Sequence, residues 1–200
     1  MIVKICGITR LEDAQAAVNA GASAIGFIFW PASPRQVEPE LARQIASQMP
    51  PFVTTVGVFV NQAQDEVNGV ADRVSLGAIQ LHGDETPEFA SGLARPVLKA
   101  VSRIDAATTR DWPDRVMLLV DAHDPVKRGG TGQKADWAAA GELARVRPVI
   151  LAGGLGPENV AGAIAAVRPF GIDVSSGVES APGIKDRGKI AALFAAIAQS

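Results

Sequence analysis

Short runs of apolar and β-branched residues recur along the chain, each followed by turn residues and an alanine-rich stretch. In these stretches, such as 11–22, 39–49, 157–167 and 186–200, Ala, Val, Leu and Ile recur with the spacing i, i+3, i+4 and i+7. This alternation predicts strands followed by helices that pack on a sheet. The predicted strands are IVKIC from Ile2, AIGFIF from Ala24, VTTVGVFV from Val53, AIQLH from Ala78, VLKAV from Val97, VMLLVD from Val116, PVILA from Pro148 and IDVSS from Ile172.

Eight consecutive units favour a closed barrel over an open sheet. The strand runs start about 24 residues apart, and their nearly continuous Val, Ile and Leu content is typical of parallel strands covered by helices. An open doubly wound sheet usually has about five or six strands and must protect two edges. We therefore expect an α/β fold, a single-domain (β/α)8 TIM barrel with short loops that spans residues 1–200. The alternative is seven strands preceded by an irregular first segment.

Composition and charge limit the classes of partner. The 200 residues include 19 Lys and Arg against 21 Asp and Glu, a formal net charge of −2, which gives no general attraction to nucleic acid or anionic membrane. The single cysteine excludes an intrachain disulfide, and no apolar run approaches the roughly 18 residues of a membrane span. With no secretory signal at its start, the chain is expected to be a soluble cytoplasmic protein that acts on a small molecule.

Polar residues stand at the ends of several predicted strands. Cys6 ends the first run, Arg35 follows the second in the proline-rich loop 31–39, His82 ends the fourth and Asp121 ends the sixth. The carboxyl ends of barrel strands meet at one mouth, where the chemistry of this architecture takes place. We therefore expect a thiol, a guanidinium, an imidazole and a carboxyl group to share that mouth.

Two small-residue turns follow the last two strands and point to an anionic ligand. They contain Gly153 and Gly154 after the seventh run, and Ser175, Ser176 and Gly177 after the eighth. Glycine lets the backbone approach an anion closely, and the loops after strands 7 and 8 form the recurring phosphate site of this fold. A tight turn is the alternative for Gly153 and Gly154 alone, but the two turns together favour a phosphate site.

Cys6 and Asp121 are the candidate catalytic residues. A free cysteine is often an inert buried side chain, yet a thiolate at a strand end could act as a nucleophile or a general base. An aspartate that ends an apolar strand could donate a proton if burial disfavours its charged form, although it could also cap a helix or order a loop. The spacing of His82 and His123 relative to Cys6 shows neither a catalytic triad nor a metal site, so metal ligation is not expected.

Other candidate residues have both structural and functional interpretations. Lys4 lies two residues from Cys6 and shares its face of the strand, so a buried Lys4 needs a partner, for which Asp173 on the neighbouring strand 8 is suitable. We expect this pair to be mainly structural. Arg35 could bind a carboxylate with two hydrogen bonds or be a solvated loop residue. His82 could donate a hydrogen bond to the substrate or be a core histidine whose hydrogen bonds are made within the protein.

These motifs, taken in order, resemble the phosphoribosylanthranilate isomerase family of tryptophan biosynthesis. No single motif is decisive, but their order covers nearly the whole chain. The matching segments are KICGIT at 4–9, GFIF and SPR within 26–35, VGVFV at 56–60, QLHG at 80–83, GGTG at 129–132, LAGGL at 151–155, DVSSGVE at 173–179 and GIKD at 183–186.

The resemblance implies an Amadori rearrangement of N-(5-phosphoribosyl)anthranilate to 1-(2-carboxyphenylamino)-1-deoxyribulose 5-phosphate, without cofactor or metal. It implies that Cys6 is the general base, that Asp121 is the general acid and that Arg35 binds the anthranilate carboxylate. The remaining candidate substrate-binding residues, with the two glycine and serine turns as the phosphate site, are His82, Gly153, Gly154, Asp173, Ser175, Ser176 and Gly177. The rivals are another phosphosugar isomerase, such as that of histidine biosynthesis, and a phosphometabolite-binding barrel without turnover.

Overall fold

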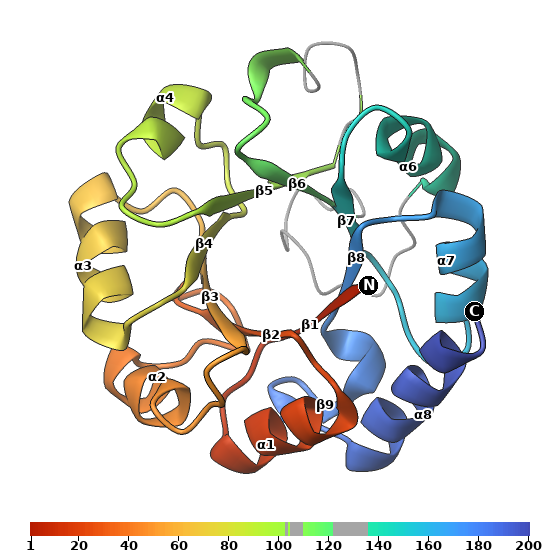
Figure 1. Cartoon of the computed structure of the whole chain (residues 1–200). Coiled ribbons are helices and arrows are strands. Elements are labelled where there is room, and N and C mark those ends of the chain that lie inside the picture. The colour runs from red at the N-terminus through yellow and green to blue at the C-terminus, as the bar shows by residue number, and fades with distance from the viewer. Residues whose placement is uncertain (103, 105–109, 122–135) are drawn as a thin grey trace.

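Eight parallel strands close into a barrel in the order β1 to β8, with β8 hydrogen-bonded to β1 (Figure 1). This computed structural model describes residues 1–102, 104, 110–121 and 136–200. The closed ring confirms the predicted (β/α)8 barrel and excludes the seven-strand alternative, because the first segment pairs on both sides. The strands are β1 (Ile2–Cys6), β2 (Ala24–Ile28), β3 (Thr54–Phe59), β4 (Ala78–Leu81), β5 (Val97–Val101), β6 (Met117–Val120), β7 (Val149–Leu151) and β8 (Gly171–Val174).

Helices surround the barrel on the outside (Figure 1). Side-chain oxygens of Thr86, Asp136 and Asp186 accept backbone N–H groups at the starts of α4, α6 and α8, which satisfies donors that the first helical turn leaves unpaired. The helices are α1 (Leu11–Ala20), α2 (Pro39–Ala46), α3 (Gln64–Val74), α4 (Pro87–Ser91), α6 (Trp137–Ala144), α7 (Val160–Val167) and α8 (Arg187–Ala198). The helical periodicity predicted for 11–22, 39–49, 157–167 and 186–200 therefore corresponds to α1, α2, α7 and α8.

Alternate residues of each strand face two different cores, one between the strands and the helices and one inside the barrel. Val3 and Ile5 of β1 belong to the large apolar cluster that includes Ala14 and Ala17 of α1, so Lys4 and the other residues of opposite parity point into the barrel. The barrel interior holds two smaller apolar clusters. One contains Ala24, Val56 and Ala78 with Leu98, and the other contains Leu119, Ile150 and Ala152 with Ala100 and Met117.

An antiparallel hairpin follows β8 and was not predicted from the sequence. A 3-10 turn, η1 (Ser176–Val178), leads into β9 (Glu179–Ala181), which pairs with β10 (Ile184–Lys185) before α8 begins. The β10 segment is only two residues long, so its pattern is too short to be recognised as a strand.

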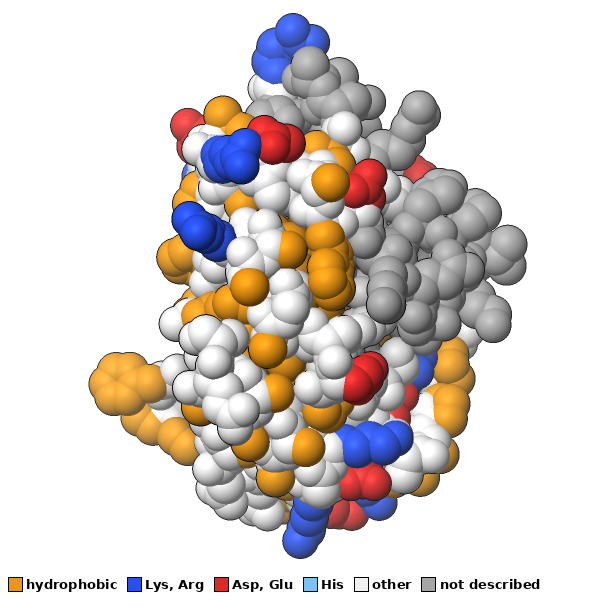
Figure 2. Space-filling view, turned by 90° about the vertical axis from the view of Figure 1, so that its right-hand side faces the viewer, with side chains coloured by type: hydrophobic (Ala, Val, Ile, Leu, Met, Phe, Trp, Pro, Cys, Tyr) orange, Lys and Arg blue, Asp and Glu red, His pale blue; other side chains and the backbone are white. Residues whose placement is uncertain are grey.

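The outer surface of the last helices is rich in small apolar residues. Figure 2 faces the side covered by α6, α7 and α8, where hydrophobic and uncharged atoms fill the middle and charged side chains gather toward the upper and lower edges. Among the described residues, no helix is long and apolar enough to cross a membrane.

Candidate active site

Cys6 ends β1 and its side chain points into the barrel over β2. It is paired in register with Gly26, and a Cβ atom at Gly26 would lie 2.9 Å from the Cys6 sulfur and 3.1 Å from Lys4 Nζ. The missing side chain at Gly26 therefore provides the space that Cys6 and Lys4 occupy. Cys6 is buried, at 6% exposure.

The predicted pair between Lys4 and Asp173 is confirmed. Lys4 Nζ lies 2.9 Å from Asp173 Oδ1, across the register that joins β1 to β8. Burial is the largest single influence and acts to lower the pKa of Lys4, but the charges and hydrogen bonds of Asp173 and Cys6 together outweigh it and the pKa is raised. Lys4 is therefore a stable buried cation beneath Cys6.

The electrostatic environment of Cys6 contains opposing influences. Burial raises the pKa of the Cys6 thiol, whereas the positive charge of Lys4 acts in the opposite direction; Asp173 raises it and Lys185 lowers it. The net direction is upward, so the thiol is the main form at neutral pH and the nearby cations favour the thiolate when it forms.

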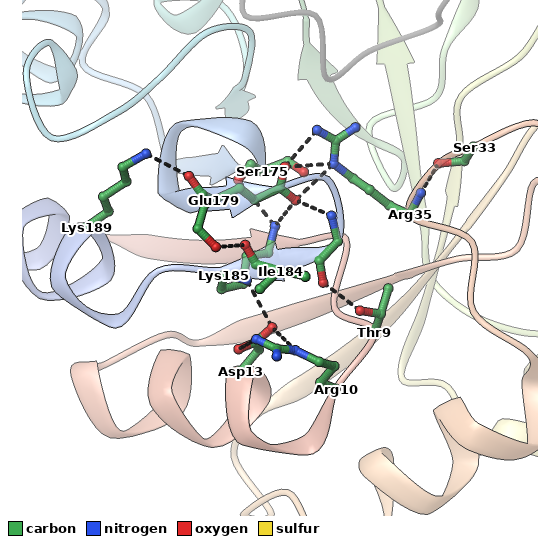
Figure 3. Close-up of polar contacts among 12 residues, drawn as sticks. Thr9, Arg10, Asp13, Ser33, Arg35, Ser175, Glu179, Ile184, Lys185 and Lys189 are labelled. Carbon is green, nitrogen blue, oxygen red and sulfur yellow. Dashed lines mark hydrogen bonds and ion pairs between the residues drawn. The ribbon is translucent and has the colours of Figure 1, made fainter.

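Arg35 is neither a solvated loop residue nor a free cation. Its Nε lies 2.9 Å and 3.1 Å from the two carboxylate oxygens of Glu179, and its Nη2 lies 2.7 Å from Oε2 (Figure 3). The Arg35 Cδ would be 2.8 Å from a Cβ atom at Gly7, which places the arginine beside the end of β1. Nη1 is not among the donors to Glu179, so the guanidinium keeps an edge for another acceptor.

Glu179 joins Arg35 to the hairpin after β8. Lys185 Nζ donates to Glu179 Oε1 at 2.8 Å and to the Ser175 carbonyl at 3.2 Å (Figure 3). Burial lowers the pKa of Lys185 below its usual value. Burial acts to raise the pKa of Glu179, but the hydrogen bonds and charges of Arg35 and Lys185 outweigh this effect, so the Glu179 pKa is also below its usual value. Neither Glu179 nor Lys185 was assigned a role from the sequence, although both lie in the motifs DVSSGVE and GIKD.

Asp121 follows β6 directly and contacts the end of β4. Its backbone N–H donates to the Val101 carbonyl at 3.0 Å, and its Oδ2 lies 3.3 Å from His82 Nε2. Gln80, two residues before His82, approaches His82 Nδ1 with its amide nitrogen at 2.9 Å. Two predicted site residues are thus brought together, and Gln80 joins them as a third that had no assigned role.

The turns after β7 and β8 pack closely against each other. Gly153 and Gly154 have φ values of 83° and 61°, which favour glycine. A Cβ atom at Gly177 would collide with the carbonyl oxygen of Leu155, so this glycine permits contact between the two loops. The backbone conformation at both turns therefore depends on small residues.

One buried hydroxyl lies between these turns and β1. Ser175 Oγ is buried without a hydrogen-bond partner among the described residues, and it would be 3.1 Å from a Cβ atom at Gly7. Ser176 is partly buried at the start of η1. A buried hydroxyl of this kind is available to a ligand.

The GGTG motif at 129–132 and His123 lie outside the described residues. Within the described part of the chain, no group of three or more His, Cys, Asp or Glu side chains is arranged to hold a metal ion.

The described geometry and the order of motifs agree with comparisons to known proteins. A profile of the N-(5'phosphoribosyl)anthranilate (PRA) isomerase family matches residues 3–196. The chain is 50% identical over 190 residues to N-(5'-phosphoribosyl)anthranilate isomerase of Pelobacter propionicus, covering 94% of this chain and 91% of that one. It is 49% identical over 203 residues to the isomerase of Pseudomonas putida, covering 98% and 97% of the two chains.

Solved structures give the same result. The crystal structure of phosphoribosyl anthranilate isomerase from Thermus thermophilus has a TM-score of 0.91 and 43% identity, covering 100% of this chain and 99% of that one. Another phosphoribosyl anthranilate isomerase, in complex with reduced 1-(o-carboxyphenylamino)-1-deoxyribulose 5-phosphate, has a TM-score of 0.86 and 41% identity, with 100% of both chains covered. With a family match over almost its whole length and relatives at about half identity, the chain belongs to the N-(5'-phosphoribosyl)anthranilate isomerase family.

Proposed function

We propose that this chain isomerises N-(5'-phosphoribosyl)anthranilate to 1-(2-carboxyphenylamino)-1-deoxyribulose 5-phosphate, an Amadori rearrangement in tryptophan biosynthesis. Family membership supports the reaction. The single observation that carries the mechanism is that Cys6 and Asp121 end two separate strands, β1 and β6, of one closed barrel. An acid and a base on different sides of a bound sugar can serve two proton transfers without moving.

Asp121 is the proposed general acid. Its carboxyl group gives a proton to the furanose ring oxygen as the bond from that oxygen to C1′ breaks. The lone pair of the anthranilate nitrogen forms the C1′=N bond, which yields an open-chain Schiff base. Asp121 is then a carboxylate, and the His82 ring beside it can stabilise this charge.

Cys6 is the proposed general base. Its thiolate removes the C2′ proton, the electrons form a C1′–C2′ double bond, and the C=N electrons return to nitrogen. The resulting enolamine tautomerises to the ketone. Lys4 and Lys185 support this role because their charges favour the thiolate inside a buried site.

The remaining site residues are proposed to bind the two anionic ends of the substrate. The turns at Gly153, Gly154 and 175–177 suit the phosphate, since glycine leaves the backbone accessible and the Ser175 hydroxyl has no partner among the described residues. Arg35 suits the anthranilate carboxylate through the edge that Glu179 does not occupy. His82 is proposed to act in the substrate site through its contact with Asp121, and Asp173 to contact the sugar with the carboxylate oxygen that Lys4 does not bind.

The direct test is turnover by the purified chain. Anthranilate attached to phosphoribose is fluorescent, so we expect its signal to decay at a rate proportional to enzyme concentration, without added metal or cofactor. Binding of the substrate without decay would contradict the proposal and favour a phosphometabolite-binding barrel. Turnover of the analogous aminoaldose of histidine biosynthesis in place of this substrate would favour the other isomerase.

A further inference from the structure

Gln80 and His82 form a hydrogen bond inside the barrel that limits the chemistry of the imidazole ring. They lie two residues apart on β4 and its end, so their side chains share one face of the strand. Gln80 is 1% exposed, and its amide nitrogen lies 2.9 Å from His82 Nδ1. An amide nitrogen can only donate, so His82 Nδ1 accepts this hydrogen bond.

The proton of a neutral His82 ring must then be on Nε2. A neutral imidazole has one donor nitrogen and one acceptor nitrogen, and Nδ1 is occupied as the acceptor. His82 Nε2 lies 3.3 Å from Asp121 Oδ2, and the two side chains are only 14% and 11% exposed. In this tautomer the protonated Nε2 faces the Asp121 carboxylate across the 3.3 Å contact, while the acceptor Nδ1 faces the amide of Gln80.

We propose that Gln80 is a positioning residue that fixes the Nε2–H tautomer of His82 and thereby directs the acidic proton of Asp121 toward the substrate. This inference rests on the proposed function, in which Asp121 is the general acid. A proton on Oδ2 would face the Nε2–H of His82, so the proton of a neutral Asp121 carboxyl is favoured on Oδ1. In the opposite tautomer Nε2 carries no proton. It would then accept the carboxyl proton of Asp121 from Oδ2, in competition with the ring oxygen of the sugar.

The proton balance of the ring-opening step follows from this arrangement. The proton passes from Asp121 Oδ1 to the furanose oxygen, the C1′–O bond breaks toward that oxygen, and the carboxyl becomes a carboxylate. The His82 N–H remains in place throughout and can donate to the neighbouring carboxylate once it has become charged. A hydrogen bond to an ionised acceptor is stronger than one to its neutral form, so the arrangement stabilises the product of the transfer.

The surroundings of Gln80 indicate a role beyond packing. Its register partners on β3 and β5 are Val58 and Leu98, which have no polar side-chain atoms. Its Oε1 is buried without a partner among the described residues. A buried unpaired acceptor disfavours folding, and an apolar residue would avoid it. The hydrogen bond to His82 is therefore the contact that distinguishes glutamine from an apolar residue here.

The tautomer can be observed directly by NMR. The chain has two histidines, so ¹⁵N-histidine labelling gives few signals, and a His82→Asn sample assigns them. Above the usual titration range of histidine, we expect the protonated nitrogen of wild-type His82 to be Nε2. Gln80→Met should give a mixture of the two tautomers, and Gln80→Glu should place a proton on Nδ1. A wild-type ring protonated at Nδ1 alone, or an unchanged tautomer in Gln80→Met, would overturn the inference.

Kinetics test the link to catalysis. We expect Gln80→Met to lower kcat roughly ten- to a hundredfold while KM changes less than about threefold, because only part of the contribution of general-acid catalysis is lost. Val58→Ala is the matched control, since it alters the neighbouring buried position without touching the hydrogen bond. It should keep the His82 tautomer and most of kcat, and equal kcat losses in both variants would contradict a specific role for Gln80.

Folding and function are separated by the same experiments. Thermal unfolding of each variant shows whether it is folded, and Gln80→Glu provides a second polar variant if Gln80→Met is unstable. An inactive wild-type chain would remove the proposed function and the catalytic part of this inference, whereas the NMR signals would still decide the tautomer. An altered tautomer with wild-type kcat would overturn the positioning role alone.

Discussion

At the scale of single residues, the environment of Cys6 shows how a buried thiol can become a base. The positive charges of Lys4 and Lys185 act to lower the pKa of the thiol, and the negative charge of Asp173 acts to raise it. The excess of positive charge favours a thiolate, while burial opposes it and keeps the Cys6 pKa above its usual value. A base of this kind is active in its ionised form, so its contribution to the rate rises with pH.

Lys4→Met tests this balance. The variant leaves Asp173 without its partner in a nearly buried position, which should lower the free energy of unfolding by about 3–5 kcal/mol. It also removes a charge that lowers the Cys6 pKa, so the ascending limb of kcat/KM against pH should move to higher pH. Urea unfolding measures the first effect and the pH profile the second. Near neutral pH we expect the variant to lose more free energy of unfolding than it adds to the activation free energy of turnover.

A double variant separates the two contributions of Lys4. Combining Lys4→Met with Asp173→Asn removes the isolated carboxylate and should recover much of the stability. A single Lys4→Met variant with wild-type stability and no turnover at any pH would contradict the structural role assigned to the pair.

At the scale of elements, close contacts between neighbouring strands and loops determine where the catalytic side chains fit. β1 and β2 are in register at Cys6 and Gly26, and the Cys6 side chain occupies the space over this glycine. The hairpin β9–β10 holds Glu179 against Arg35, and Lys189 of α8 donates to the Glu179 carbonyl at 2.7 Å (Figure 3). The hairpin thus connects the loop after β2 to the first turn of α8.

Gly26→Ala should disturb the site through a single methyl group. The added Cβ atom would be 2.9 Å from the Cys6 sulfur, so the thiol must move, with a destabilisation of about 1–3 kcal/mol and a reduced kcat. Gly69→Ala in α3 is the matched control because nothing lies within 4 Å of its Cβ position. We expect that control to keep full activity and to gain about 0.5–1 kcal/mol of stability. Equal activity in the two variants would show that the space over Gly26 is unimportant.

Glu179→Gln tests the contribution of the hairpin cluster through its acid dependence. Because the pKa of Glu179 is lower in the folded chain, its contribution to stability is present above the usual value of 4.5 and is lost as pH falls through the folded pKa. Glu179→Gln should lower the thermal midpoint at neutral pH and flatten the further loss in acid. The control Glu40→Gln removes an exposed pair with Arg43 and should change little. An unchanged acid dependence in Glu179→Gln would contradict this account.

At the scale of the whole molecule, the barrel was predictable from the sequence because every strand repeats the same local pattern. The eight runs from Ile2 to Ile172 overlap the observed strands, and the same-face relation of Lys4 and Cys6 follows from the period of a strand. The contacts of Arg35 were not predictable, since its partner Glu179 is 144 residues away in a hairpin without a repeated pattern. Gln80 was given no role because an amide inside a strand has no spacing signal. His82 and Asp121 were expected at one mouth, but their direct contact could not be predicted because it depends on the geometry of the closed ring.

The central claim is that Cys6 and Asp121 transfer protons at two sides of one bound sugar. The most direct measurement compares kcat of Cys6→Ser and Asp121→Asn with that of the wild-type chain, together with the affinity of each for a reduced product analogue. We expect each variant to lose at least about a hundredfold in kcat, the lower range of a general acid or base, while analogue affinity and thermal midpoint stay close to wild type. Near wild-type turnover in either variant would contradict the role given to that residue.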